Sequence, residues 1–188
     1  LQSLLMRIQR IRVFDSACGS GNFLIIAYKE LRKFEMAVLK ALDDLGDQSV
    51  MFMSGIRLTQ FYGIEIDDFA HEIALLSLWL AENQMNKLFE AEFGYSEPML
   101  PLKDSGNIFH GNALRLDWEK VCPKQDEHGD LEVYVCGNPP FVHSKKRTDE
   151  QNADMERVLG HLQGFKMIDY VGCWFEKCRL YVNKANAS

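Results

Sequence analysis

The sequence predicts an α/β domain with a mainly parallel sheet and flanking helices. Short apolar runs alternate along the chain with longer segments of helical periodicity, which is typical of a parallel sheet. Turn-forming, acidic or amide residues follow each apolar run, as they do where strands end. The composition, 47% hydrophobic and 26% charged, is that of a folded protein. A length of 188 residues favours a single domain over residues 1–188.

The first strand and helix are predicted at the N-terminal end. The run "IRVFDSA" at residues 11–17 is apolar and β-rich, and it follows a short segment that has the pattern of a helix end. Beyond Asn22, apolar residues recur every three or four positions, which predicts a helix with one inward stripe. That stripe consists of Leu24, Ala27, Leu31, Phe34 and Val38. The polar segment 43–53 is expected to be a loop.

A second strand and helix follow in the same way. We predict a strand at residues 60–66, "QFYGIEI", and a helix from Asp68 to about Asn86. That helix is apolar on nearly every side through "IALLSLWLA", so we expect it to be buried all round. Glycines and prolines in segment 91–106 predict a connection.

The remaining elements complete the alternation. Strands are predicted at 107–114, "NIFHGNAL", and 131–137, "LEVYVCG", with the polar stretch "CPKQDEHGD" between them as a loop. Helices are predicted at 150–160 and 165–182. The second of these is expected to direct inward Ile168, Val171, Trp174, Phe175 and Cys178. Segment 183–188 trails off in polar residues, and the abrupt start and end suggest a piece of a longer protein, with a fold incomplete at both ends.

Composition narrows the possible settings. A net charge of −6 argues against non-specific nucleic-acid binding by the whole surface, although "HSKKR" at 143–147 can form a local basic lip. The five cysteines are scattered, without the paired Cys/His spacing of a zinc site, and are interpreted as reduced thiols. Because the chain has no signal peptide and no apolar run of about 20 residues, we expect a cytoplasmic protein that does not enter a membrane.

The first strand end, "DSACGSGN", carries two glycines before a helix, Gly19 and Gly21. Glycines let a backbone approach a ligand closely and direct its free amides at it. The dinucleotide fingerprint needs a third glycine where this chain has Leu24, so nicotinamide or flavin binding is disfavoured. An ordinary tight turn remains the alternative.

The next two strand ends carry side chains that suit a nucleoside. Glu65 is placed to accept hydrogen bonds from ribose hydroxyls, and Ile66 can cover one face of an adenine. Asn112 can donate and accept at once, which suits an adenine edge. A solvated glutamate is the alternative for Glu65, and a helix-capping or turn asparagine is the alternative for Asn112.

The fourth strand ends in "NPPF", residues 138–141. Two prolines make a rigid turn that lacks N–H donors. Such a turn can present the Asn138 side-chain oxygen and the Pro139 carbonyl oxygen together as two acceptors for one NH2 group. Phe141 offers a flat face for a planar substrate. A simple strand-terminating turn would explain neither the asparagine nor the phenylalanine.

Taken in order, "DSACGSGNFL", "GIEID", "GNAL" and "NPPF" resemble the S-adenosylmethionine-dependent amino-methyltransferases that modify adenine in DNA. The wider phrases "ACGSGNFLIIAYKELRKFE", "YGIEIDDFAHEIALLSLWLAENQMN", "NPPFVHSK" and "MIDYVGCWF" resemble the MmeI-like group of bacterial type II restriction-modification enzymes. The resemblance covers about residues 11–182 and implies the Rossmann-like fold of class I methyltransferases. Ser16 departs from it, because proline is usual at that position.

The resemblance also implies roles for individual residues. The loop of Ala17, Cys18, Gly19 and Gly21 would hold the methionine part of the cofactor, with Asp15 near its amino group. Glu65 would bind the ribose, and Ile66 and Asn112 the adenine of the cofactor. Asn138 and Pro139 would bind the target amine, and Phe141 would stack on the flipped base.

The DNA contacts are expected to involve Pro140 and the cations Lys145, Lys146 and Arg147, although a solvated lip is an alternative for these cations. The implied function is N6-adenine methylation of duplex DNA, without a metal, in a chain fused to recognition and nuclease domains. An RNA base amine or a protein glutamine is the alternative acceptor. A truncated cofactor-binding module without activity is the alternative to an enzyme.

Overall fold

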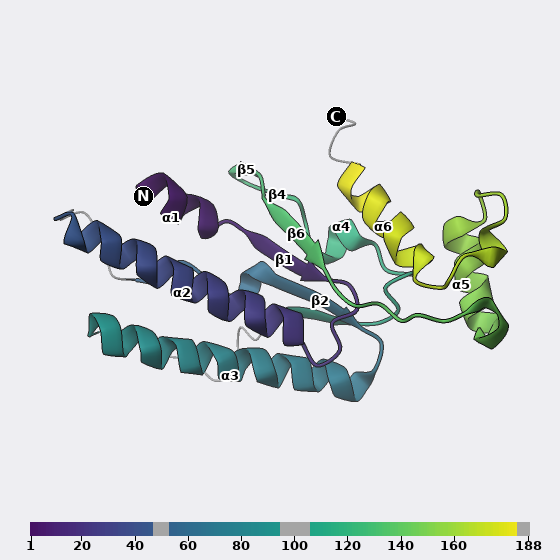
Figure 1. The fold of residues 1–188 in the computed structure, drawn as a ribbon, viewed down its shortest axis with the longest axis horizontal. Helices are drawn as coiled ribbons and strands as arrows, with labels where there is room; N and C mark the ends of the chain where they lie inside the picture. Colours follow the sequence, from purple (N-terminus) through teal and green to yellow (C-terminus); the bar gives the residue numbers. More distant parts are fainter. Residues whose placement is uncertain (47–52, 95–105, 184–188) are drawn as a thin grey trace.

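The computed structural model describes residues 1–46, 53–94 and 106–183, and it contains a four-stranded, fully parallel sheet (Figure 1). The strand order is β3-β2-β1-β6. The strands are β1 (Arg12–Asp15), β2 (Phe61–Glu65), β3 (Asn107–His110) and β6 (Val133–Cys136). With helices on its faces, this sheet confirms the predicted α/β class.

The strand order reverses at β1. The chain passes from β1 outward through β2 to β3, and then returns so that β6 pairs with the opposite edge of β1. Asp15 and Cys136 are partners in register at the carboxyl ends of these two strands. In open parallel sheets a ligand crevice forms at such a reversal, because the loops on either side leave in opposite directions.

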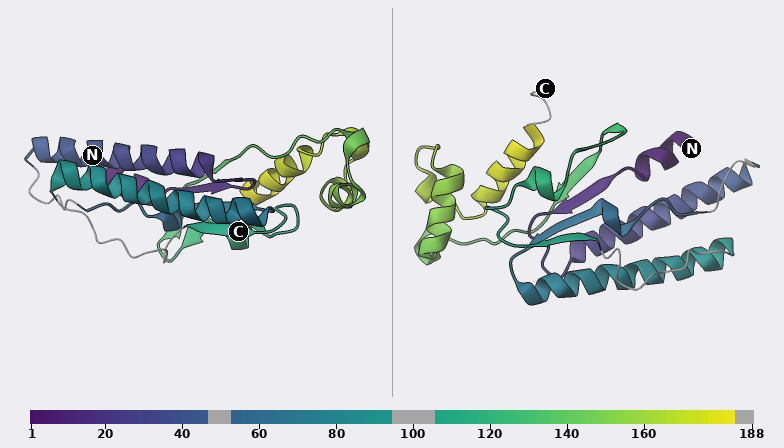
Figure 2. Two further views of the ribbon diagram at one scale, coloured as in Figure 1. Left: turned by 90° about the horizontal axis from the view of Figure 1, so that it is seen from below. Right: turned by 180° about the vertical axis from the view of Figure 1, so that it is seen from behind.

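One face of the sheet is covered by three helices, α1 (Gln2–Ile8), α2 (Asn22–Asp44) and α3 (Asp68–Phe93), with the two long helices side by side (Figures 1 and 2). Strand side chains alternate between faces, so Val13 and Phe61 point to this side. They pack in one apolar cluster with Leu24 of α2 and Leu78 of α3. The register of β1 and β2 is therefore fixed by burial on both faces.

The other face packs against α4 (Trp118–Val121) and α6 (Gly172–Asn183). Phe14, the neighbour of Val13, lies here with its ring edge-on to Trp118 at 5.1 Å between centroids. Tyr62 and Ile64 belong to the same cluster. Helix α5 (Asp149–Leu159) projects beyond the carboxyl ends of the strands (Figure 1). Side chains of α5 can therefore reach the loops at the carboxyl ends of the strands.

Short elements account for several differences from the sequence prediction. The expected loop at 122–130 contains an antiparallel hairpin, β4 (Gln125–Asp126) and β5 (Gly129–Asp130). The expected third strand ends at His110 rather than at 114. A helix predicted from residue 165 begins only at Gly172, after the 3-10 turn η3 (Phe165–Met167). Two other 3-10 turns are η1 (Leu58–Gln60) and η2 (Ser144–Lys146).

Burial corrects three predicted helix faces. Phe34 of α2 and Phe175 of α6 were expected inward, but their side chains are exposed. The α2 stripe is shifted onto Tyr28 and Arg32, which are buried. Ile168, also expected inward, lies before α6 and is 38% exposed. Helix α3 is buried along one stripe only, and leaves outward four large apolar side chains, Phe69, Leu76, Leu80 and Leu88.

The expected loops are only partly within the described residues. Helix α2 runs to Asp44 and α3 to Phe93, so both helices extend into the segments predicted as connections. Residues 47–52, 95–105 and 184–188 lie outside the described part of the chain. Within the described part, none of the helices combines the length and apolar character that a membrane crossing requires.

Candidate functional site

A cleft of about 560 Å³ lies at the carboxyl ends of the strands. Its volume is in the range of small-molecule sites, roughly 300–1,000 Å³. The loops after β1, β2, β3 and β6 all contribute to it, together with α5 and the start of α6. It is lined by Ser16, Ala17, Gly19, Ile64, Glu65, Ile66, Gly111, Asn112, Ala113, Asn138, Pro140, Thr148, Glu150, Gln151, Asp154, Tyr170 and Trp174.

The glycine loop after β1 turns directly into α2. Gly21 caps the helix with a φ of 84°, a left-handed conformation that favours glycine, and an added Cβ would lie 3.3 Å from the Cβ of Ala74. The Trp174 indole donates a hydrogen bond to the Ser16 carbonyl at 3.2 Å. The Cys18 amide bonds the Ile64 carbonyl at 3.0 Å. The loop is thus held from both neighbouring segments.

Asp15 lies beneath this loop and is fully buried. Its Oδ1 atom accepts a hydrogen bond from the Ala17 amide at 3.0 Å, whereas its Oδ2 atom is buried without a partner. Burial, and secondarily the charge of Glu65, raises the pKa of Asp15 to about 6. A buried carboxylate oxygen without a partner destabilises the ionised form. This position therefore suits a cationic donor such as an ammonium group.

Glu65 follows β2 and connects two loops. Its carboxylate accepts hydrogen bonds from the backbone amides of Gly19, Ile66 and Asp67 at 2.8 Å each. These bonds fix the carboxylate at the cleft wall. A carboxylate has about four lone-pair positions, so it retains capacity for a hydroxyl group. The adjacent Ile66 side chain is 64% exposed and lines the cleft.

Asn112 lies in the turn after β3. Its Oδ1 atom accepts a hydrogen bond from the Leu114 amide at 2.9 Å, and its Nδ2 atom donates to Asp154 Oδ2 at 2.9 Å. The first bond is the turn-capping role considered as the alternative for this residue. The second bond ties the β3 loop to helix α5. Asn112 still lines the cleft, so both interpretations of the residue are compatible with its position.

The "NPPF" turn follows β6 directly across from Asp15. Gly137 has a φ of 144°, and an added Cβ would lie only 2.7 Å from Asp15 Oδ1, so this position accepts no larger residue without a shift. Asn138 and Pro140 line the cleft, while Phe141 is 73% exposed. Beyond the turn, the Val142 amide donates to Asp169 Oδ1 at 3.1 Å, and the Val142 carbonyl accepts from the Tyr170 amide at 3.2 Å. Residues 169 and 170 therefore anchor the turn.

The three cations after the turn differ in what they contact. Lys145 and Lys146 lie in η2 with exposed side chains. The Arg147 guanidinium instead donates to the backbone carbonyls of Ile168 at 3.0 Å and Lys166 at 2.7 Å. It thereby holds the η3 segment against α5. Of the predicted basic lip, the two lysines extend freely and the arginine is engaged in the fold.

The structure brings just under half of the fifteen predicted site residues to the lining of one cleft. Seven of them line it: Ala17, Gly19, Glu65, Ile66, Asn112, Asn138 and Pro140. The other loop residues predicted to bind the cofactor, Asp15, Cys18 and Gly21, are not among those that line the cleft. The lining also includes residues that were not predicted as site residues, among them Asp154 of α5, Tyr170 of the loop before α6 and Trp174 of α6. An acidic residue within an amphipathic helix gives no signal that it is buried, although "MIDYVGCWF" marked the last two.

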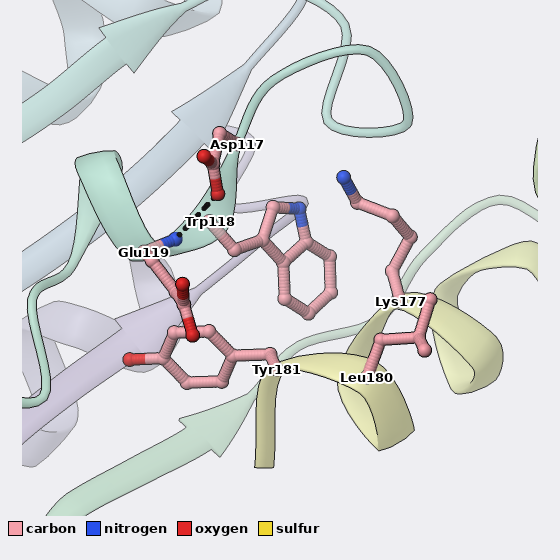
Figure 3. A pocket seen from close by; sticks show the side chains of 6 residues that line it. All are labelled: Asp117, Trp118, Glu119, Lys177, Leu180 and Tyr181. Atoms are coloured by element: carbon pink, nitrogen blue, oxygen red, sulfur yellow. Dashed lines mark hydrogen bonds between the residues drawn. The ribbon is translucent and has the colours of Figure 1, made fainter. Parts of the chain in front are cut away.

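A second, smaller hollow of about 110 Å³ lies between α4 and α6 (Figure 3). Trp118 and Tyr181 pack there with ring centroids 6.1 Å apart. The Lys177 ammonium lies 5.6 Å from the centroid of the Trp118 ring and donates to the Leu116 carbonyl at 2.6 Å. These contacts fasten α6 to the sheet. By holding α6 in place, the same contacts also position Trp174, which lies one helical turn before Lys177 and lines the main cleft.

The chain matches a family model along its whole length, residues 1–188, and the family is described as the DNA-methyltransferase domain of MmeI. The chain belongs to this family. DNA methyltransferase A of Bacillus subtilis (strain 168) is 47% identical over 188 residues, which are 100% of this chain and 21% of that protein. A type II restriction enzyme and methyltransferase of Methanocaldococcus jannaschii is 43% identical over 139 residues, 73% of this chain and 11% of that protein.

Among solved structures, the chain is similar to the Type IIL restriction-modification enzyme MmeI in complex with DNA. The TM-score is 0.85 at 37% sequence identity, over 97% of this chain and 24% of that chain. This similarity confirms the expected methyltransferase fold. The chain spans about a fifth of the length of the Bacillus subtilis protein and about a quarter of the solved MmeI chain.

Proposed function

We propose that this chain transfers a methyl group from S-adenosylmethionine to the N6 amino group of adenine in duplex DNA. It would do so as the catalytic core, residues 1–188, of a cytoplasmic restriction-modification protein. The observation that carries the proposal is the shared cleft, in which the "NPPF" turn faces the glycine loop and Glu65. The length of the relatives supports fusion to recognition and nuclease domains.

The residues of the cleft fit the cofactor. When bound, S-adenosylmethionine supplies a methyl group made electrophilic by a positively charged sulfur. The buried Asp15 Oδ2, which lacks a partner, suits the ammonium of its methionine part. Gly19 has a φ of 55° and open space where a Cβ would stand, so a ligand can lie close to the backbone. Glu65 and Ile66 suit the ribose and one adenine face.

The "NPPF" turn suits a planar amine. The lone pair of an exocyclic adenine amine is delocalised into the ring, which makes this nitrogen a weak nucleophile. The Asn138 side-chain oxygen and the Pro139 carbonyl oxygen would each accept a hydrogen bond from one N–H group of this amine. These two bonds would favour a tetrahedral nitrogen. Positioning of this kind lowers a barrier by several kcal/mol. No strong base is needed, because the methylated amine becomes acidic.

Phe141 suits a base that has left the duplex. Unstacking a base costs a few kcal/mol, and stacking on an aromatic ring returns about 1–3 kcal/mol. The side chain of Phe141 is 73% exposed, so its ring is available to a base from outside. The remaining cost must be met by other contacts, among them phosphate contacts by Lys145 and Lys146. A recognition domain would supply the rest.

Two alternative functions, methylation of another acceptor and cofactor binding without activity, can be distinguished by experiment. Methylation of an RNA base amine or a protein glutamine uses a similar turn, so the full-length protein should be assayed with duplex DNA, RNA and protein acceptors. Transfer to protein or RNA alone would replace the DNA proposal. A module without activity would show no S-adenosylmethionine binding by calorimetry at millimolar ligand.

Replacing Asn138 by alanine tests the mechanism directly. In the full-length protein we expect Asn138→Ala to lower the methylation rate by at least about 10²–10³-fold, because one of two amine acceptors is lost. The affinity for S-adenosylmethionine should change less than about threefold, since the cofactor residues remain. Asn152→Ala is the matched control, because Asn152 is an exposed amide of α5. Near-normal turnover by Asn138→Ala would refute the assigned role.

A further inference from the structure

Asp154 of α5 is a buried carboxylate that the proposed reaction does not use. Its side chain is 1% exposed. It accepts hydrogen bonds from Asn112 Nδ2 at 2.9 Å and from the Arg115 guanidinium at 2.8 and 3.2 Å. The Tyr170 hydroxyl lies 3.5 Å from the same Oδ2 atom, and Arg157 approaches Oδ1 at 3.9 Å. Placing a carboxylate at such a buried position is costly unless it is paired and hydrogen-bonded, and Arg115 and Asn112 supply these partners.

The contact with Asn112 determines which way the amide points. A carboxylate bound to an arginine accepts hydrogen bonds and donates none, so it selects the NH2 end of the neighbouring amide. The Leu114 amide, a donor, selects the oxygen end at 2.9 Å. The two partners therefore agree on one orientation. These bonds use one N–H of Nδ2 and one lone pair of Oδ1, so the amide keeps capacity for one further donor contact and one further acceptor contact.

We propose that Asp154 is a positioning residue that fixes the Asn112 amide so that it selects adenine in the cofactor. This inference rests on the proposed use of S-adenosylmethionine. The edge of an adenine presents an amino donor beside a ring-nitrogen acceptor, which complements an amide held in one orientation. A 6-oxo purine presents an acceptor at the amino position and an N–H at the neighbouring ring nitrogen, and would meet the wrong atom at each place. An Asn112 amide free to rotate would accept both.

A purely structural role for Asp154 makes a different prediction. If Asp154 only balanced the charge of Arg115 and held α5, its loss would weaken the binding of every ligand of the cleft to the same degree. If it orients Asn112, its loss would weaken the adenine form selectively. The quantity that separates the two roles is the ratio of the dissociation constants for the adenine and 6-oxo cofactors.

The test uses full-length protein, titrated by calorimetry with S-adenosylmethionine and with its 6-oxo analogue, S-inosylmethionine. We expect the wild-type protein to favour the adenine form at least about tenfold, as a bidentate contact does. Asp154→Asn should reduce this preference to within about threefold, because an amide at 154 opposes a donor either to Asn112 or to Arg115. Asp154→Glu, which keeps the charge but displaces the carboxylate, should act in the same direction and serves if Asp154→Asn does not fold.

Two further variants complete the experiment. Asn112→Ala should lose the preference as well, and adding Asp154→Asn to it should change the ratio no further, as expected for two residues acting as one unit. Arg157→Gln, which alters an exposed arginine near the same carboxylate, should keep the wild-type ratio. An unchanged ratio in both Asp154 variants would overturn the inference. A wild-type protein that binds neither compound would instead overturn the proposed function.

Discussion

At the scale of single residues, Asp15 links the stability of the domain to the cofactor binding proposed for it. Burial raises the pKa of its carboxyl to about 6, compared with 3.8 for an unperturbed aspartate. The folded state then holds a proton that the unfolded chain releases as pH rises through this interval. The free energy of unfolding should therefore fall as pH rises from about 4 to 6, by an amount on the order of 3 kcal/mol from this group.

Chemical denaturation across pH 4–7 measures this dependence. Asp15→Asn should remove it, because the amide does not titrate while its oxygen can still accept from the Ala17 amide. If Asp15 binds the ammonium as proposed, the same variant should also bind S-adenosylmethionine more weakly, since the negative charge is lost. Identical pH profiles of unfolding for the two proteins would show that Asp15 is not the group responsible.

The residues that could be predicted were those placed directly after strands. Glu65 and Asn138 were found because chain position alone brings strand ends of a parallel sheet to one edge. Asp154 and Trp174 could not be found in this way. Each lies within a helix. Periodicity predicted that Trp174 points inward, but which helical residues reach the cleft depends on where the helix docks, and local pattern does not determine that. Gly137 was also missed, because its role depends on the close passage of β6 against Asp15.

At the scale of elements, α3 shows that an apolar helix need not be buried all round. Leu78 is fully buried between α3 and the sheet, whereas Leu80 of the same helix is 45% exposed. We expect Leu78→Ala to lower the free energy of unfolding by about 2–5 kcal/mol, because it leaves a cavity in the core. Leu80→Ala should cost less than about 1 kcal/mol. Chemical denaturation of both variants checks this, and equal losses would contradict the observed orientation of the helix.

Periodicity predicted the order and type of the main elements correctly, but it did not always predict which face of a helix is buried. A predicted stripe on α2 put Phe34 inward, but the structure instead buries Arg32 and Glu35, which lie 3.8 Å apart as an ion pair. Charged residues are expected at the surface unless a partner is known. The partners of this pair, including Asn86 of α3 and Ser54, come from distant segments. Sequence periodicity alone cannot reveal such partners.

At the scale of the whole molecule, two apolar clusters pack on opposite faces of the sheet, and the cleft lies at the edge formed by the carboxyl ends of the strands. The cluster under α2 and α3 fixes the glycine loop, and the cluster under α4 and α6 fixes Tyr170 and Trp174. The cleft lies where these two halves meet, at the reversal of strand order. Both clusters support the glycine loop, because Cys18 belongs to the first cluster and Trp174 of the second donates to the Ser16 carbonyl.

The distribution of charge indicates where the domain would contact DNA. A net charge of −6 disfavours DNA binding by the surface of this domain as a whole, so the proposed DNA contacts require local positive charge. Lys145 and Lys146 are exposed cations that follow the "NPPF" turn. Each phosphate contact contributes about 0.9 to the slope of log K against log salt concentration. Replacing both lysines by alanine in the full-length protein should therefore reduce that slope by about 2. Fluorescence anisotropy with duplex DNA at several salt concentrations measures it.

A control of equal charge separates local contacts from net charge. Lys33 and Lys40 lie on the exposed side of α2, on the opposite part of the fold from the turn, and their double alanine variant changes the net charge by the same amount. If contacts are local, this control should retain the wild-type slope while Lys145→Ala/Lys146→Ala loses about 2. Equal losses in the two variants would mean that DNA responds to the overall charge of the domain, and that the lip beside the turn does not touch the phosphates.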